Sequence, residues 1–110
     1  MREGEKMCQE KKIIVNTVQI IRETTELFYQ QRVKEGYNKM QDTIAGIMQV
    51  VDVLHEYKSV HEEFSLDETR IAGSLTEAMN AMEAGDTVLL ADILEYDFIE
   101  YLQELSSELD

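Results

Sequence analysis

Hydrophobic residues recur along the first part of the chain at the spacings of an amphipathic helix. Because an α-helix completes a turn in 3.6 residues, apolar positions three and four apart lie on one face. Residues 5–34 carry two adjacent rows of this kind: Ile14, Val18, Ile21, Thr25 and Phe28, and Ile13, Thr17, Ile20, Thr24 and Leu27. Gly36 follows these rows, and a glycine in that place predicts the end of the helix.

A second helix is predicted over residues 39–57. Asn38 followed three residues later by Gln41 matches a capping box, in which side chains bond the free amides of a first helical turn. Gly46 offers a place where a neighbouring helix can approach closely. The apolar stripe consists of Met40, Ile44, Ile47, Val51 and Leu54.

Two further helices are predicted over residues 66–84 and 87–108. Ser65 with Glu68 matches a capping box for the first of them, Gly85 ends it, and Asp86 can cap the second. The junction is therefore short, which favours antiparallel neighbours. The two stripes are Ile71, Leu75, Ala78 and Met82, and then Leu90, Leu94, Phe98, Tyr101, Leu105 and Leu109.

Four amphipathic helices in 110 residues predict one all-α domain, residues 1–110, folded as an antiparallel up-and-down four-helix bundle. Each stripe needs a partner surface, and a bundle buries all four around one axis. The composition agrees with this prediction, since the chain has no Pro and only five Gly.

Charge narrows the classes of partner. The formal net charge is −13, which disfavours nucleic acid and anionic lipid surfaces. The ten basic residues all lie between Arg2 and Arg70, and the last forty residues carry ten acidic side chains. This acidic stretch is either a solvated outer face or a surface for a basic partner.

Candidate chemistry is sparse. Cys8 is the single cysteine and cannot form an internal disulfide, and the first apolar run, Ile13 to Val15, is too short for a signal peptide or membrane span. We therefore expect a cytoplasmic protein without membrane insertion. Asp52-x-x-His55 is the nearest match to a di-iron motif, and His61 is the other imidazole, so two full motifs cannot be assembled. We expect no enzymatic activity, no metal and no cofactor.

Two residue types are candidates for partner contact. Met40, Met48, Met79 and Met82 lie on or beside the stripes, where flexible methionines either fill the core or form an adaptable binding surface. Tyrosines combine an apolar ring with a polar tip, as protein interfaces often require. The partner-binding candidates are Glu95, Tyr96, Glu100 and Tyr101.

Residues 79–105 resemble the closing segment of small helical proteins from Firmicutes, some of which are similar to flagellar export chaperones. The resemblance is carried by Gly85-Asp86, Leu89-Leu90-Ala91-Asp92 and Leu94-Glu95-Tyr96. The chain departs from the chaperones in lacking their Asn-Pro-Tyr-type N-terminal segment. The resemblance implies a bacterial cytosolic helical bundle with no assigned chemistry.

Three hypotheses for function follow. The first is a non-enzymatic protein-interaction module, an adaptor or flagellar/export-type chaperone that holds an amphipathic segment of a partner in a groove. The second is a structural homodimer without another ligand. The third is an enzyme with a carboxylate-bound metal.

Overall fold

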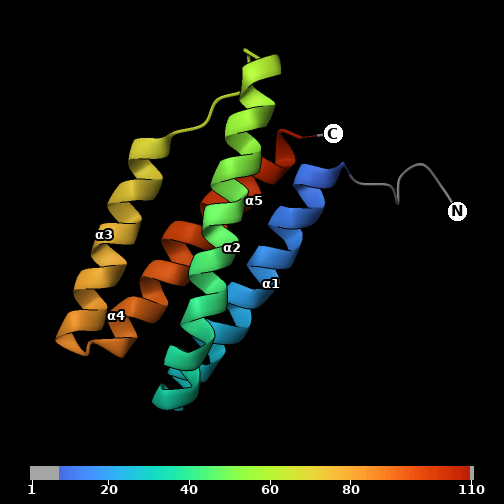
Figure 1. Cartoon of the computed structure of the whole chain (residues 1–110). Helices are drawn as coiled ribbons and strands as arrows, with labels where there is room; N and C mark the ends of the chain where they lie inside the picture. Colours follow the sequence, from blue (N-terminus) through green and yellow to red (C-terminus); the bar gives the residue numbers. More distant parts are fainter. Residues whose placement is uncertain (1–7, 110) are drawn as a thin grey trace, which may run out of the picture.

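The computed structural model describes residues 8–109, and every regular element within that range is helical. Helix α1 spans Gln9–Tyr29, α2 spans Val33–Val60 and α3 spans Glu68–Ala84. The C-terminal helix is continuous and comprises α4 (Thr87–Asp92), the π-helical segment η2 (Ile93–Ile99) and α5 (Glu100–Ser107). Successive helices run in opposite directions, so the predicted all-α bundle is confirmed (Figure 1).

The four predicted stripes form a single core. The α1 stripe from Ile14 to Phe28 is buried, and so are all six predicted positions of the C-terminal helix from Leu90 to Leu109. Burial of this apolar surface supplies the main drive for folding. Among the described residues, none of the helices has the length and apolar character that a bilayer span requires.

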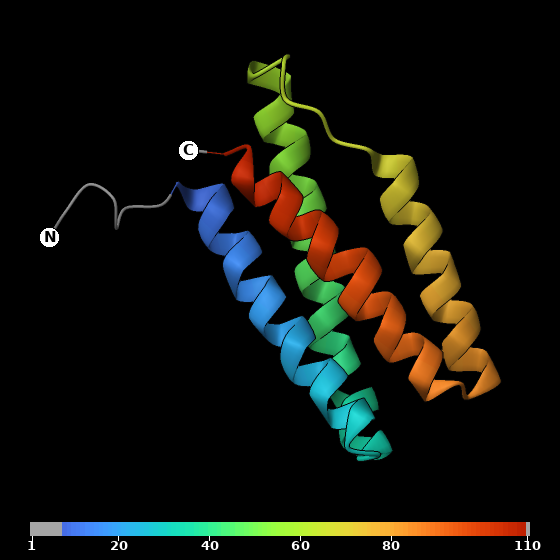
Figure 2. The ribbon, with the colours of Figure 1, turned by 180° about the vertical axis from the view of Figure 1, so that it is seen from behind.

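The C-terminal helix lies between α1 and α3 and packs against both (Figure 2). Its π-helical segment explains how one helix serves two neighbours. In π geometry residues five apart fall near the same face, and both Ile93 with Phe98 and Leu94 with Ile99 are buried. The helix thereby buries a wider face than the α-helical spacing predicts.

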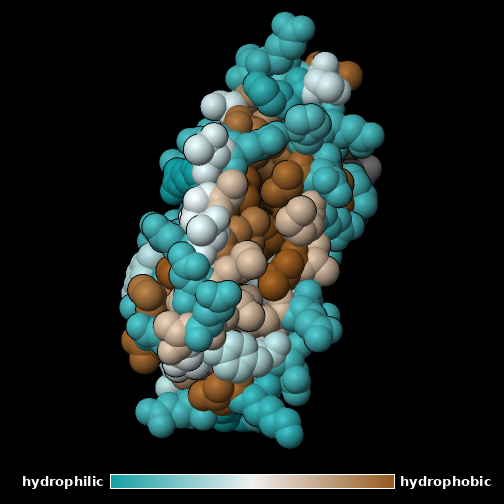
Figure 3. Space-filling model, turned by 60° about the vertical axis from the view of Figure 1, so that its left-hand side comes forward, coloured by the Kyte–Doolittle hydropathy of each residue, from teal (hydrophilic) through white to brown (hydrophobic). Residues whose placement is uncertain are grey.

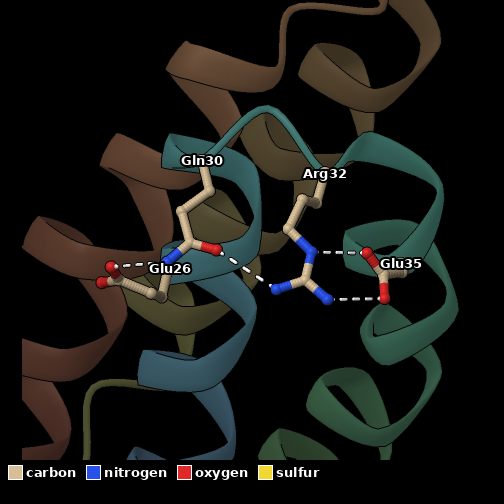
Figure 4. A network of polar contacts seen from close by, with 4 residues as sticks. All are labelled: Glu26, Gln30, Arg32 and Glu35. Carbon is tan, nitrogen blue, oxygen red and sulfur yellow. Dashed lines mark hydrogen bonds and ion pairs between the residues drawn. The ribbon is translucent and has the colours of Figure 1, made fainter.

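The turn between α1 and α2 lies earlier than predicted. The first helix ends at Tyr29 rather than near residue 34, because Gln31 adopts a left-handed backbone with φ of 64° and breaks the helix there. Arg32 donates two hydrogen bonds to the carboxylate of Glu35, at 2.6 and 2.8 Å, and a third to Gln30, which itself bonds Glu26 (Figure 4). This bidentate pairing lowers the pKa of Glu35. The network is exposed, so it orders the turn more than it stabilises the fold.

Three predicted capping features are wrong. Asn38 lies inside α2 and caps nothing, and Gly36 does not end a helix but faces the ring of Phe28 across the α1–α2 contact. Ser65 is likewise not the cap of α3, since the Asp67 carboxylate accepts the bond from the Arg70 amide. Gly85 and Asp86 were predicted correctly: Gly85 has φ of 70° and Asp86 accepts from the Leu89 amide.

Small residues let α1 and α2 pack closely. The Thr17 hydroxyl donates to the Gly46 carbonyl at 3.4 Å. A Cβ on residue 46 would lie 3.1 Å from the Thr17 side chain, so the absence of a side chain at Gly46 allows the two helices to approach closely. Further along, the hydroxyls of Thr24 and Thr43 are buried and 2.8 Å apart. Since the Thr24 hydroxyl donates to the Ile20 carbonyl, the Thr43 hydroxyl is the donor between the two threonines.

Gly36→Ala tests the contact with Phe28. An added Cβ would lie 2.5 Å from the nearest ring carbon, so we expect a loss of about 1–3 kcal/mol in the free energy of unfolding, measured with urea. Gly73→Ala is the matched control: its Cβ meets nothing within 4 Å, and helix propensity predicts a gain of about 0.5–1 kcal/mol. An equal response at both sites would contradict the close packing at Gly36.

The threonine pair predicts an asymmetry. Thr24→Val leaves the buried Thr43 hydroxyl without its acceptor and should cost about 1–3 kcal/mol, whereas Thr43→Val leaves Thr24 bonded to Ile20 and should cost less than about 1 kcal/mol. The double variant removes both hydroxyls and should be no less stable than Thr24→Val. Chemical denaturation of the three variants checks this order, and equal losses for the two single variants would show that the assigned donor is wrong.

Candidate functional site

Helix α2 has one row of buried residues and, beside it, a second row that is more exposed. Thr43, Gly46 and Val50 are buried in the molecule. A neighbouring row comprises Ile44, Met48 and Val51, and the last two line a pocket together with residues of α3. Met48 is 46% exposed, and Ile44, which belongs to the predicted stripe of α2, is 37% exposed, so that stripe is only partly covered. An uncovered apolar row on a helix is available for contact.

Helix α3 is also only partly covered. Ile71, Ala78 and Ala81 are buried, and α3 packs against α4 and η2. On a neighbouring side of the helix, Leu75 is half-buried, and Met79, which lies one turn beyond Leu75, is 60% exposed. Helix α3 thus uses one side for the C-terminal helix and leaves an apolar side free.

Contacts at the start of α3 fix its position on the C-terminal helix. The Tyr101 hydroxyl accepts a hydrogen bond from the Asp67 amide at 2.8 Å, and the Arg70 guanidinium lies 4.1 Å above the Tyr101 ring. Arg70 also reaches Glu104 at 3.4 Å. These contacts hold the helix by its N-terminal end and leave Arg70 directed toward the C-terminal helix.

A groove results between α2 and α3. Within the described residues, the backbones of these two helices do not approach closely along their length, and the molecule is wide and flat, measuring 41 × 34 × 18 Å. His55 on α2 and Glu68 on α3 bridge the groove near one end, with Nδ1 and Oε2 2.7 Å apart. A pocket of about 200 Å³ lies beside this bridge, lined by Met48, Val51, Glu68, Ile71, Ala72 and Leu75.

The surface view supports this description. Figure 3 shows apolar residues gathered in an elongated hollow on the α3 side of the molecule, with polar residues along its borders. We call this region the α2–α3 groove and define it by the six pocket residues together with Ile44 and Met79. Its apolar lining and acidic Glu68 suit an apolar segment rather than a polar small molecule.

The methionines divide between core and groove. Met40 is buried and Met82 packs partly against the core, as the core-filling interpretation predicts. For Met48 and Met79 that interpretation is wrong, because both side chains are largely exposed. Periodicity could not distinguish the two buried methionines from the two exposed ones. All four lie on or beside a stripe, and a stripe does not reveal which part of it another helix covers.

The partner-binding candidates from the sequence do not form one surface. Tyr101 is only 8% exposed and serves the start of α3, whereas Tyr96 and Glu100 are exposed. Glu95 is half-buried and lies near Tyr29 of α1. None of the four residues lines the α2–α3 pocket. Binding by these residues stays a prediction, but Tyr101 is occupied within the fold.

Tyr29 and Asp92 form a second polar feature. The Tyr29 hydroxyl donates to Asp92 Oδ1 at 2.8 Å and links α1 to α4. Partial burial and this hydrogen bond to a carboxylate, with smaller effects of Tyr96 and Glu95, raise the pKa of Tyr29 well above its ordinary value. The hydrogen bond between α1 and α4 therefore accounts for a protonated tyrosine beside the carboxylates of Asp92 and Glu95.

The two histidines considered for metal binding have other partners. His55 pairs with Glu68, and His61 stacks on Tyr57 with ring centroids 3.9 Å apart while its Nδ1 bonds the Tyr57 carbonyl. No group of three or more His, Cys, Asp or Glu with the geometry for a metal ion occurs among residues 8–109.

Comparison with known proteins gives one match. The model of a family described as a domain of unknown function, DUF8042, matches residues 7–108. No curated protein and no solved structure matches the chain significantly.

The Tyr29–Asp92 contact predicts a loss of stability in alkali. The folded state holds the Tyr29 proton more tightly than the unfolded chain, so this contribution is complete below the unfolded pKa of about 10 and is lost as pH rises above it. Urea titrations at about pH 9 and about pH 11 should show the advantage of the native protein over Tyr29→Phe shrinking with pH. Asp92→Asn should weaken this dependence, and an advantage that is constant with pH would show that Tyr29 titrates normally.

Proposed function

The chain belongs to the DUF8042 family, whose description names no activity, and we propose from its own surface that it is a non-enzymatic protein-interaction module that binds an amphipathic segment in the α2–α3 groove. One observation carries the proposal: two neighbouring helices each leave an apolar row uncovered, and the two rows face the same hollow (Figure 3). Burying such surface contributes roughly 25 cal/mol per Å², which is a driving force for binding.

The composition of the groove suits an adaptable contact. Met48 and Met79 lie on opposite sides of it, and their unbranched side chains can rearrange around different apolar partners. The smaller Ala72 lies between the larger side chains and leaves space for a partner residue. These features favour recognition of an apolar face over recognition of one fixed sequence.

The groove is also held open by the fold. Helix α3 is secured through Tyr101 and Arg70 to the C-terminal helix, and α2 is packed on α1. A preformed groove needs little rearrangement on binding, which lowers the entropic cost of association.

The resemblance to Firmicutes helical proteins extends the proposal to a cytoplasmic adaptor or export-type chaperone. A chaperone of this kind keeps an amphipathic segment of its client covered before assembly, and the α2–α3 groove provides the surface for doing so. This mode of binding makes a direct prediction.

Selection from a displayed library of amphipathic helical peptides tests the binding mode. We expect binders whose affinity falls at least about tenfold in Met48→Glu and in Met79→Glu, because each variant places a charge in the apolar contact. Both positions are exposed, so thermal melts should show that the variants fold normally. Val88→Glu is the matched control, since Val88 is 63% exposed and lies outside the groove. Failure to select any peptide, or equal loss in the control, would refute the proposal.

A further inference from the structure

We propose that the occupant of the α2–α3 groove is a short cationic amphipathic helix from another protein. This inference rests on the proposed function and specifies the partner's chemistry. The apolar lining requires an apolar face on the partner, and the charges around the lining determine the sign of the charge on the partner's polar face.

Helical register places carboxylates in and beside the groove. Glu68 lines the pocket itself. Asp52 follows Met48 by one helical turn on α2, and Glu83 follows Met79 by one turn on α3, so each exposed methionine has a carboxylate four residues away on the same side of its helix. Asp52 and Glu83 are both exposed and can pair with a partner.

No Lys or Arg neutralises this border, in which Glu68 is paired with His55. No Lys or Arg lines the pocket, and Arg70, the single basic residue of α3, lies over Tyr101 and beside Glu104. No Lys or Arg follows Arg70 in the sequence. A cationic partner therefore meets complementary charge along α3, which raises the association rate and excludes acidic competitors.

The dimensions fit a short helix. Ile44 to Val51 on α2 and Ala72 to Met79 on α3 are each eight residues long, and the seven rises between the ends correspond to about 10 Å at 1.5 Å per residue. A groove of that length accommodates about two turns of a helix, with anchors at positions i, i+3 or i+4, and i+7. The groove walls are helices, so side-chain packing rather than addition of a strand is the available mode.

A second copy of the chain fits the groove poorly. The net charge of −13 opposes close approach of two copies. Outside the groove, three of the seven exposed large apolar residues among those described, Val88, Leu89 and Tyr96, lie on the strongly acidic C-terminal helix. The basic residues of α1 do accompany an apolar stripe, but that stripe is buried, and the exposed large apolar residues of this helix are Val15 and Tyr29.

Three synthetic peptides test whether the groove prefers a cationic partner. Each is a helix of about 15 residues with the same leucine stripe, and the polar face carries Lys, Gln or Glu. We expect fluorescence anisotropy to show the Lys peptide binding about tenfold more tightly than the Gln peptide, with the Glu peptide weakest. The advantage of the Lys peptide should fall as the ionic strength rises from about 0.05 to about 0.5 M.

Two charge-matched double variants locate the effect. Asp52→Asn with Glu83→Gln should remove most of the advantage of the Lys peptide and leave the Gln peptide unchanged. Glu95→Gln with Glu100→Gln removes the same charge from the C-terminal helix, away from the pocket residues, and should leave the order of affinities intact. If this second variant abolishes the advantage instead, the cationic partner binds the C-terminal helix and the inference is wrong.

The remaining outcomes separate the inference from the proposed function. Equal binding of the Lys and Gln peptides, with loss in Met48→Glu, would overturn the cationic partner and leave the groove as a binding site. Failure of all three peptides to bind would count against both proposals. Sedimentation showing a dimer that Met48→Glu dissociates would identify a second copy as the occupant and overturn the inference.

Discussion

The C-terminal helix must satisfy two neighbours at once, and the arrangement of the other helices depends on this constraint. Its buried residues face both α1 and α3, and the π-helical segment Ile93–Ile99 brings residues five apart onto a common side. Because α3 is held on one side of this helix and α1 on the other, α2 packs on α1 without closing fully against α3. The open groove follows from this order of packing.

The contact between α1 and α2 is tight, in contrast to the open groove between α2 and α3. Small residues and buried threonine hydroxyls bring these helices close together, with Thr17 against Gly46 and Thr24 against Thr43. Each hydroxyl has a partner, and no buried side-chain polar atom among the described residues lacks one. The molecule therefore combines a tight helix pair with a looser pair, and the proposed binding surface lies at the looser one.

The distribution of charge strengthens this division. The basic residues are concentrated in the first two helices, and several are engaged locally, as Arg32 is with Glu35 and Lys39 with Glu23. The second half of the chain keeps its carboxylates largely unopposed. Of the two interpretations of this acidic region, a surface for a basic partner is the one that the groove makes testable, since Glu83 follows the groove residue Met79 by one turn of α3.

The sequence by itself determined the all-α class, the four stripes and the α3–α4 junction, because these depend on helical periodicity and on local backbone preferences. Gly85 and Asp86 act within one turn of themselves, and their roles could be predicted from neighbouring residues alone. The tertiary structure decided the break at Gln31, the role of Gly36, the burial of Tyr101 and the exposure of Met48 and Met79. These features depend on which helix lies opposite, and a periodic stripe reports that a residue needs cover without reporting whether the folded chain provides it.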